Sequence, residues 1–376
     1  MESVASATRV QISRVAFAGG GTLGVCYAAA LEAFAELTGT DLAAKDGGIK
    51  EAVGTSVGAL TAMSVVLGVG TKKCMEIART KDIGSMIDIN PIHALHRNGL
   101  GLDSGDKARG EIAEQIRVAL GFESAIEAQA ITLEELQAIT GKRLVVSTTD
   151  LVTRRAIHLD SSCPDTRRVR VCDAVYASMA IPTLYEPLRM GKHLLCDGGL
   201  IDNFPMYVWV NCPPETVLGF RVHAVSPLMN ARTACVADIL QRVAQMSFQS
   251  ATRFQWLCMP EAIRSRVITI NVSEIKAFDS HLTATQRNRM LTDAKAQALD
   301  DLQEMFTFGR RVSTASGRCQ DLQSLVQDPA WMASLPLEGS DALFVEDVIL
   351  ERGMARIAGA LVLGFVSCMS ETTGNV

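Results

Sequence analysis

The sequence lacks several patterns that identify whole classes of protein. Its ten cysteines form no C-x-x-C pair and show no zinc-like spacing. A formal net charge of −5 leaves no basic excess that would attract nucleic acid or an anionic membrane through bulk charge. The acidic residues form no cluster of the kind that binds calcium. We therefore expect no nucleic-acid partner, no metal and no cofactor.

Long apolar runs are also missing. The N-terminal stretch MESVASATRVQISRV contains no apolar segment of the length that a secretory signal needs. Residues 357–369 are mostly apolar, but thirteen residues are too few to span a bilayer, which takes about 20. Several cysteines lie in apolar runs, which suits reduced, buried thiols and a cytoplasmic protein. Export without a cleaved signal stays open.

Apolar residues, by contrast, are plentiful. They make up 48% of the 376 residues, enough for the core of one large α/β domain with an appendage. Strand and helix signals alternate from Arg9 to about Leu67, as in a parallel sheet with crossover helices. Residues 309–320 have the composition of a linker, and residues 321–376 follow as a helical tail. In that tail, residues 357–369 form either a buried terminal helix or a segment that docks on lipid.

The pentapeptide GTSVG, residues 54–58, follows the strand-like run IKEAV and precedes the helix-like run ALTAMSVV. It matches the nucleophile-elbow pattern G-x-S-x-G. Gly54 and Gly58 remove Cβ atoms where the chain turns sharply from strand to helix, so Ser56 can hold a strained backbone with its hydroxyl exposed. The alternative is a glycine-rich turn with a capping serine, because so short a pattern also arises by chance.

Upstream, the strand-like run RVAFA leads into GGGTLG, residues 19–24, and then into the helical stretch VCYAAALEAFAEL. A strand, a glycine loop and a helix form an anion cradle, because backbone N–H groups and the helix dipole converge there. The loop also satisfies the dinucleotide-binding fingerprint G-x-G-x-x-G, which needs an acidic residue ending a second strand about 20 residues later. Neither Asp41 nor Asp46 ends such a strand. An oxyanion hole is therefore favoured over a dinucleotide site.

A third pattern lies far downstream. Asp197 ends the short apolar run HLLCD and is followed by Gly198 and Gly199. These glycines allow the backbone to turn away, which leaves the carboxylate above the end of the strand. Asp-Gly-Gly is also a good hairpin turn, so the tripeptide alone does not indicate chemistry.

In their order, GGGTLG, GTSVG and DGG resemble the patatin-like phospholipase family, whose members hydrolyse lipid esters with a Ser–Asp dyad. The resemblance covers roughly residues 12–306 and includes LGLDSGDKARGEIAEQI, LVVSTTDLVTRRAIHLD and VCDAVYASMAIPTLYEPL. It implies an α/β three-layer sandwich in which helices flank a central, mostly parallel sheet. The catalytic domain would occupy residues 10–308.

The resemblance also implies roles for individual residues. Ser56 would be the nucleophile and Asp197 the general base. The oxyanion hole would form in the first glycine motif, from Gly19, Gly20, Gly21, Thr22 and Gly24. The nucleophile elbow would be shaped by Gly54 and Gly58, and the base would be supported by Gly198 and Gly199.

The implied reaction is hydrolysis of a carboxylic ester in a phospholipid or acylglycerol, through an acyl-serine intermediate. Many family members carry Lys or Arg where this chain has Leu23, so both substrate classes stay open. The partner would be lipid at a membrane or lipid-droplet interface, with the protein attached peripherally. An activating protein is a further expectation from some branches of the family. The alternatives are a catalytically idle lipid-binding protein of the same fold and a dinucleotide-binding oxidoreductase.

Two further features bear on this expectation. Of the six histidines, His193 lies four residues before Asp197, but on a strand that spacing separates two side chains by about 13 Å. We therefore expect surface or loop-lining roles for all six. Around Met246, the stretch AQMSFQSATRFQWLCM is either a lipid-facing helix, with Phe248, Phe254, Trp256 and Met259, or part of the core.

Overall fold

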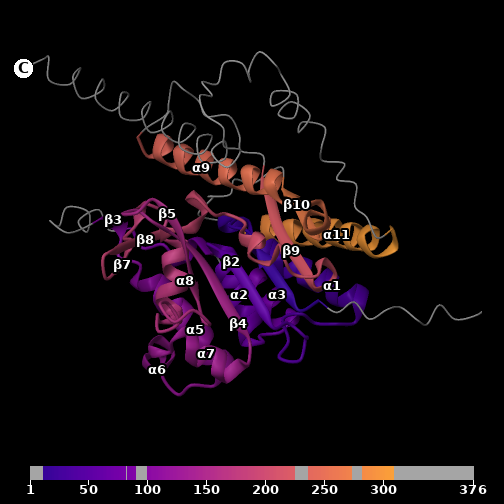
Figure 1. The fold of residues 1–376 in the computed structure, drawn as a ribbon, viewed down its shortest axis with the longest axis horizontal. Helices are drawn as coiled ribbons and strands as arrows, with labels where there is room; N and C mark the ends of the chain where they lie inside the picture. Colours follow the sequence, from indigo (N-terminus) through magenta and orange to yellow (C-terminus); the bar gives the residue numbers. More distant parts are fainter. Residues whose placement is uncertain (1–11, 82, 90–99, 225–235, 273–281, 309–376) are drawn as a thin grey trace, which may run out of the picture. The chain divides into compact units, whose positions relative to one another are not determined.

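A computed structural model describes residues 12–81, 83–89, 100–224, 236–272 and 282–308 (Figure 1). The predicted linker at 309–320 and the predicted tail at 321–376, with its apolar segment 357–369, lie outside these residues. The proposed domain boundaries therefore stay predictions. In the part of the chain that is described, no helix is both long enough and apolar enough to cross a membrane.

The centre of the fold is an eight-stranded sheet (Figure 1). Its strands are β1 (Arg14–Phe17), β2 (Glu51–Thr55), β4 (Arg143–Asp150), β5 (Arg155–Asp160), β7 (Leu188–Met190), β8 (His193–Asp197), β9 (Val217–Ala224) and β10 (Val267–Val272). The order is β10-β9-β1-β2-β4-β8-β7, with β5 paired to β4. From β10 to β4 every pairing is parallel, whereas the pairings of β4 with β5 and β8, and of β7 with β8, are antiparallel. The expected mostly parallel central sheet is confirmed.

A separate two-stranded sheet pairs β3 (Gly101–Asp103) with β6 (Thr183–Tyr185). The helices are α1 (Cys26–Thr38), α2 (Val57–Leu67), α3 (Thr71–Thr80), α5 (Asp106–Leu120), α6 (Ala125–Ala130), α7 (Leu133–Thr140), α8 (Val171–Met179), α9 (Val236–Cys258), α10 (Glu261–Arg264) and α11 (Ala284–Phe308). Short 3-10 helices are η1 (Gly21–Val25), η2 (Ile83–Met86), η3 (Gly198–Leu200), η4 (Pro205–Trp209) and η5 (Pro214–Thr216).

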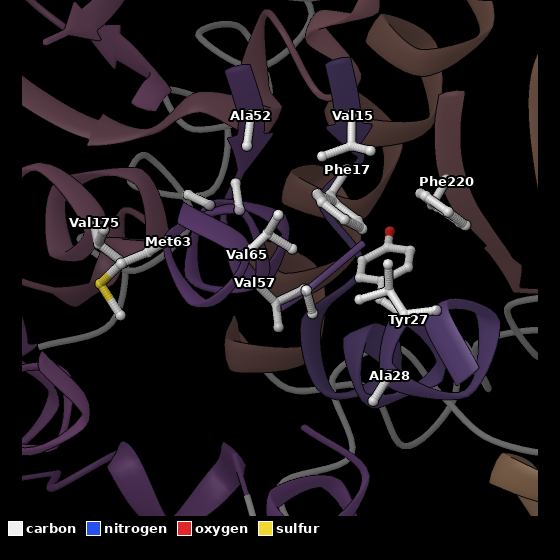
Figure 2. Packing of buried hydrophobic residues seen from close by; sticks show 14 of the residues in the cluster. Val15, Phe17, Tyr27, Ala28, Ala52, Val57, Met63, Val65, Val175 and Phe220 are labelled. Atoms are coloured by element: carbon white, nitrogen blue, oxygen red, sulfur yellow. The ribbon is translucent and has the colours of Figure 1, made fainter. Parts of the chain in front are cut away.

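Both faces of the sheet are covered, because its central strands carry apolar side chains on both sides. On one face, Val15 and Phe17 of β1 join a core with α1, α2 and α8, as Figure 2 shows. Phe17 stacks on Phe220 of β9 with ring centroids 5.1 Å apart. On the other face, Ala16 and Val53 belong to a second cluster with residues of η4 and α10. The three layers predicted from the resemblance are therefore present.

Candidate active site

The predicted nucleophile lies at a strained turn between a strand and a helix. Ser56 follows β2 directly and precedes α2, with φ 55° and ψ −129°. A β carbon added to Gly54 would lie 2.2 Å from the Gly58 carbonyl oxygen, and one added to Gly58 would lie 2.4 Å from the Phe17 carbonyl oxygen. Both positions therefore require glycine for close backbone contact, and the backbone of Ser56 carries the strain typical of nucleophile elbows.

Asp197 ends β8 and is fully buried. Its Oδ1 accepts a hydrogen bond of 2.8 Å from the Gly199 amide, whereas its buried Oδ2 has no partner of ordinary hydrogen-bond geometry among the described residues. Burial raises the pKa of the carboxyl to about 7, although the Gly199 amide and the nearby Ser56 side chain lower it in part. Asp197 and Ser56 are thus brought together, and one oxygen of the carboxylate has no hydrogen-bond partner among the described residues.

The glycine loop runs beside the same serine. A β carbon added to Gly19 would lie 3.4 Å from Ser56 Cβ, so this loop faces the elbow. The Gly19 amide is already engaged, since it donates to the Asn203 carbonyl at 2.9 Å. Among the described residues, the amides of Gly20 and Gly21 donate no hydrogen bond. These two N–H groups are therefore the donors available for an oxyanion, and the loop's position beside Ser56 disfavours a pyrophosphate site.

The remaining two candidates in the first motif have different surroundings. Gly24 packs against the start of α2, and a β carbon there would lie 2.3 Å from Val57 Cγ1. Thr22 is buried in η1. Leu23 is also buried, with 1% exposure, inside the apolar core. Its side chain does not reach the protein surface, so it offers no contact to a substrate headgroup.

The end of α8 and the residues directly after it hold both candidate catalytic residues in place. Ser178 accepts a hydrogen bond of 2.8 Å from the Ser56 amide and donates one of 2.6 Å to the Ser147 carbonyl. Two residues later, the Ala180 carbonyl accepts a hydrogen bond of 2.8 Å from the Asp197 amide. Both residues belong to the run ASMAIPTL, which carried the resemblance but had no assigned role. The run therefore has a structural role, because its contacts fix the backbone of Ser56 relative to that of Asp197.

Asn203 connects three parts of the site. Its carbonyl binds the Gly19 amide, and its side-chain nitrogen donates to Thr252 of α9 at 2.7 Å. A β carbon added to Gly199 would lie 2.7 Å from Asn203 Oδ1, so a side chain at position 199 would collide with Asn203. The site residues predicted from the sequence do not include Asn203. A polar residue six positions after the predicted base, beside Pro205, gave no recognisable signal of its own.

Asp202 is a second buried carboxylate that sequence reasoning missed. It is 2% exposed, and its Oδ2 accepts from Ser147 Oγ at 3.0 Å and from Tyr207 at 3.1 Å. The His158 ring also hydrogen bonds with this oxygen at 2.6 Å. The carboxylate is therefore saturated, and it anchors the turn after Asp197 to β4 and β5. Gly198 lies in the same turn, where a β carbon would meet the Ser147 carbonyl oxygen at 2.4 Å.

The histidines with described contacts have carboxylate partners other than Asp197. His193 Nδ1 lies 2.8 Å from Asp150, and His158 pairs with Asp202. Within the described ranges, no group of three or more His, Cys, Asp or Glu side chains is arranged to hold a metal ion. The arrangement provides a serine, a basic carboxylate and two backbone donors, which is the chemistry of acyl transfer.

Helix α9 covers the turn that follows Asp197. Gln255 accepts a hydrogen bond of 2.9 Å from the Phe204 amide and donates to Asp202, and Thr252 contacts Asn203. Phe248, one turn earlier on this face, lies against Gly199. Of the stretch around Met246, Phe248 is turned toward the site, whereas Met246 is 54% exposed; contact of this helix with lipid stays a prediction.

Comparison with known proteins identifies the family of this chain. Residues 15–208, just over half of the chain, match the Patatin-like phospholipase family. The fold is similar to that of VipD from Legionella pneumophila, with a TM-score of 0.52 and 16% identity over 78% of this chain and 67% of that chain. ExoU from Pseudomonas aeruginosa, in its complex with SpcU, is 13% identical over 79% of this chain and 53% of its own, with a TM-score of 0.44. From the family match over these residues, the chain belongs to the patatin-like phospholipases.

Proposed function

We propose that this protein is a lipid acyl hydrolase that cleaves carboxylic esters with Ser56 as nucleophile and Asp197 as general base. One observation carries the proposal most directly: a fully buried carboxylate, whose pKa burial raises to about 7, lies near a serine on a strained elbow and has one oxygen without a partner among the described residues. A carboxyl group with its ordinary pKa near 4 is too weak a base for this task. Membership of the family supports lipid hydrolysis as the type of reaction.

The reaction proceeds in two halves. Asp197 Oδ2 takes the hydroxyl proton while Ser56 Oγ attacks the ester carbonyl carbon, and the Gly20 and Gly21 amides stabilise the oxyanion. The tetrahedral species collapses to an acyl-serine as the alcohol leaves with the proton from Asp197. A water molecule then loses a proton to Asp197, attacks the acyl-serine and releases the fatty acid, which restores the Ser56 hydroxyl.

The substrate reaches the site from a lipid surface, to which α9 attaches the protein peripherally. Ile239, Met246 and Leu257 are 48%, 54% and 38% exposed. Their spacings of seven and eleven residues are close to two and three helical turns, so they form one stripe on α9. The stripe lies opposite the face that holds Phe248, Thr252 and Gln255 over the site. A lipid surface that binds the stripe is therefore separated from the catalytic groups by the width of one helix.

The test is release of free fatty acid from phospholipid vesicles and from emulsified triacylglycerol. We expect Ser56→Ala and Asp197→Asn each to lower the rate by about 10³-fold or more on the preferred substrate, because each removes a reacting group. Exposed Ser162→Ala and Asp165→Asn are the matched controls and should retain the wild-type rate. The ratio between vesicles and emulsion decides between phospholipid and acylglycerol.

Other results would change the proposal in defined ways. An active Asp197→Asn enzyme would place the base elsewhere. A wild-type protein that binds vesicles but releases no fatty acid is either an idle lipid-binding protein or an enzyme that needs an activating protein. Adding a cell lysate to the assay separates these two, since only the second gains activity that depends on Ser56.

A further inference from the structure

A pocket opens in the helical layer beside the candidate active site. Its walls come from α1 with η1, from α2 and from α3, and it is closed by η2 and α5. Its lining includes Gly24 of the glycine loop and Val57, the residue directly after Ser56. Figure 2 shows Val57 and Ala28, two of its lining residues, on the facing sides of α2 and α1. The pocket therefore starts where the two loops of the candidate site meet.

The lining is apolar. Leu60 of α2 and Ile77 of α3 contribute aliphatic surface. Two hydroxyl groups also line the pocket, but each donates to a carbonyl of its own helix: Thr61 to Val57 at 3.1 Å and Ser64 to Leu60 at 3.0 Å. The lining also includes Cys74, Ser85 and Gln115, but most of its residues are apolar. A hydrocarbon chain fits such a lining better than a polar group does.

Among the described lining residues, the charged ones are Lys81 and Glu111. Lys81 and Glu111 form an ion pair of 3.1 Å, with side chains that are 62% and 35% exposed. The long Lys81 side chain keeps its ammonium group in water, while the neighbouring apolar surface extends inward. The pocket therefore combines an apolar interior with a solvated polar edge, which is the profile of a site for an amphiphile.

We propose that this pocket receives the fatty acyl chain of the ester substrate and sets the preferred chain length. The inference rests on the proposed function, because it takes the reacting carbonyl to lie between Ser56 and the Gly20 and Gly21 amides. From that point the chain passes over the contact of Gly24 with Val57 and enters between α1 and α2. Each additional methylene group that is buried should improve binding by about fourfold, until the pocket is full.

The test uses two substitutions, each of which fills the pocket from a different helix. Ser64→Leu adds volume from α2, and Ile77→Trp adds it from α3, so a folding defect in one variant does not end the test. Gln129→Leu, on exposed α6, is the control for an added apolar side chain outside the pocket. The measured quantity is the ratio of kcat/KM for p-nitrophenyl laurate to that for p-nitrophenyl butyrate, with thermal denaturation used to check folding.

We expect either filling variant to lower this ratio at least tenfold and to move the preferred chain length to shorter esters, while Gln129→Leu keeps the wild-type ratio. Folded filling variants whose ratio stays within twofold of wild type would overturn the proposal. If wild type hydrolyses neither ester, either the proposed function is wrong or the enzyme needs an activating protein, and binding of fluorescent cis-parinaric acid tests the pocket separately. Weaker binding in both filling variants supports it, and unchanged binding rejects it.

Discussion

At the scale of single residues, the protonation state of Asp197 should control the rate. The pKa of this carboxyl is raised to about 7, and only its deprotonated form can take the Ser56 proton. We therefore expect kcat/KM for a soluble short-chain ester to rise with pH, to reach half its maximum near pH 7 and to level off above pH 8. The measurement is a pH profile from 5 to 9 at constant ionic strength, with circular dichroism at each pH. A half-maximum near pH 4 would mean that the base has an ordinary carboxyl pKa.

The same residue should cost stability at high pH. Because its pKa is higher in the folded than in the unfolded protein, the folded state binds the proton more tightly. The stabilisation that results is complete below about pH 4 and is lost as the pH rises through about 7. Asp197→Asn removes the buried charge and keeps an oxygen for the Gly199 amide. The variant should therefore gain free energy of unfolding relative to wild type at pH 8, by up to about 4 kcal/mol, and less at pH 5.

Urea denaturation at the two pH values measures this difference. Asp165→Asn, at an exposed position, should show the same small offset at both pH values. An offset for Asp197→Asn that does not change between pH 5 and pH 8 would contradict the raised pKa.

Among the secondary-structure elements, replacing a glycine with alanine should change the free energy of unfolding in opposite directions in α2 and α5. In α2, a β carbon at Gly58 would lie 2.4 and 2.5 Å from the Phe17 and Ala18 carbonyl oxygens, which belong to backbone that cannot rotate away. In α5, Gly110 has no heavy atom within 4 Å of its added β carbon. We expect Gly58→Ala to lower the free energy of unfolding by at least about 2 kcal/mol. Gly110→Ala should raise it by about 0.5–1 kcal/mol, since alanine is the better helix former.

Denaturant melts of the two variants and wild type make the comparison, with the slope of the transition used to check two-state behaviour. If both substitutions changed stability in the same direction, the close approach of α2 to β1 would not be the reason for Gly58.

At the scale of the whole molecule, the exposed stripe on α9 should determine attachment to lipid. Replacing Ile239, Met246 and Leu257 together with serine removes the apolar surface that would enter the interface. We expect the triple variant to partition into neutral phosphatidylcholine vesicles at least tenfold more weakly than wild type. Neutral vesicles are suitable because a net charge of −5 gives no bulk attraction to anionic lipid.

Vesicle flotation measures the partitioning, and a second triple variant serves as the control. Val118→Ser, Ile126→Ser and Ile139→Ser remove residues that are 59%, 78% and 56% exposed, on α5, α6 and α7. This control should float like wild type. Equal losses in the two variants would assign the attachment to general surface hydrophobicity, and a change from dimer to monomer in the α9 variant alone would assign the stripe to a second copy of the chain.

Much of the fold could be predicted from local pattern. Apolar β-branched runs followed by glycine and then by helical periodicity identified β1 with α1 and β2 with α2, because chain direction and turn geometry are local properties. The strain at Ser56 was also predictable, since two glycines two residues away on either side leave room for a sharp turn. The antiparallel addition of β8 and β7 next to β4 had no comparable signal, because strand pairing depends on contacts distant in sequence.

For the candidate site, local pattern was enough to predict the residue types and their order: a serine on an elbow, an aspartate before two glycines and a loop of three glycines. Three features depend on packing between distant segments. The Gly19 amide donates to Asn203, Leu23 points into the core, and Asp197 is buried with no partner for Oδ2 among the described residues. Burial sets the basicity of a carboxylate, and burial results from the packing of β4, α8 and α9 around one turn, which no local pattern encodes.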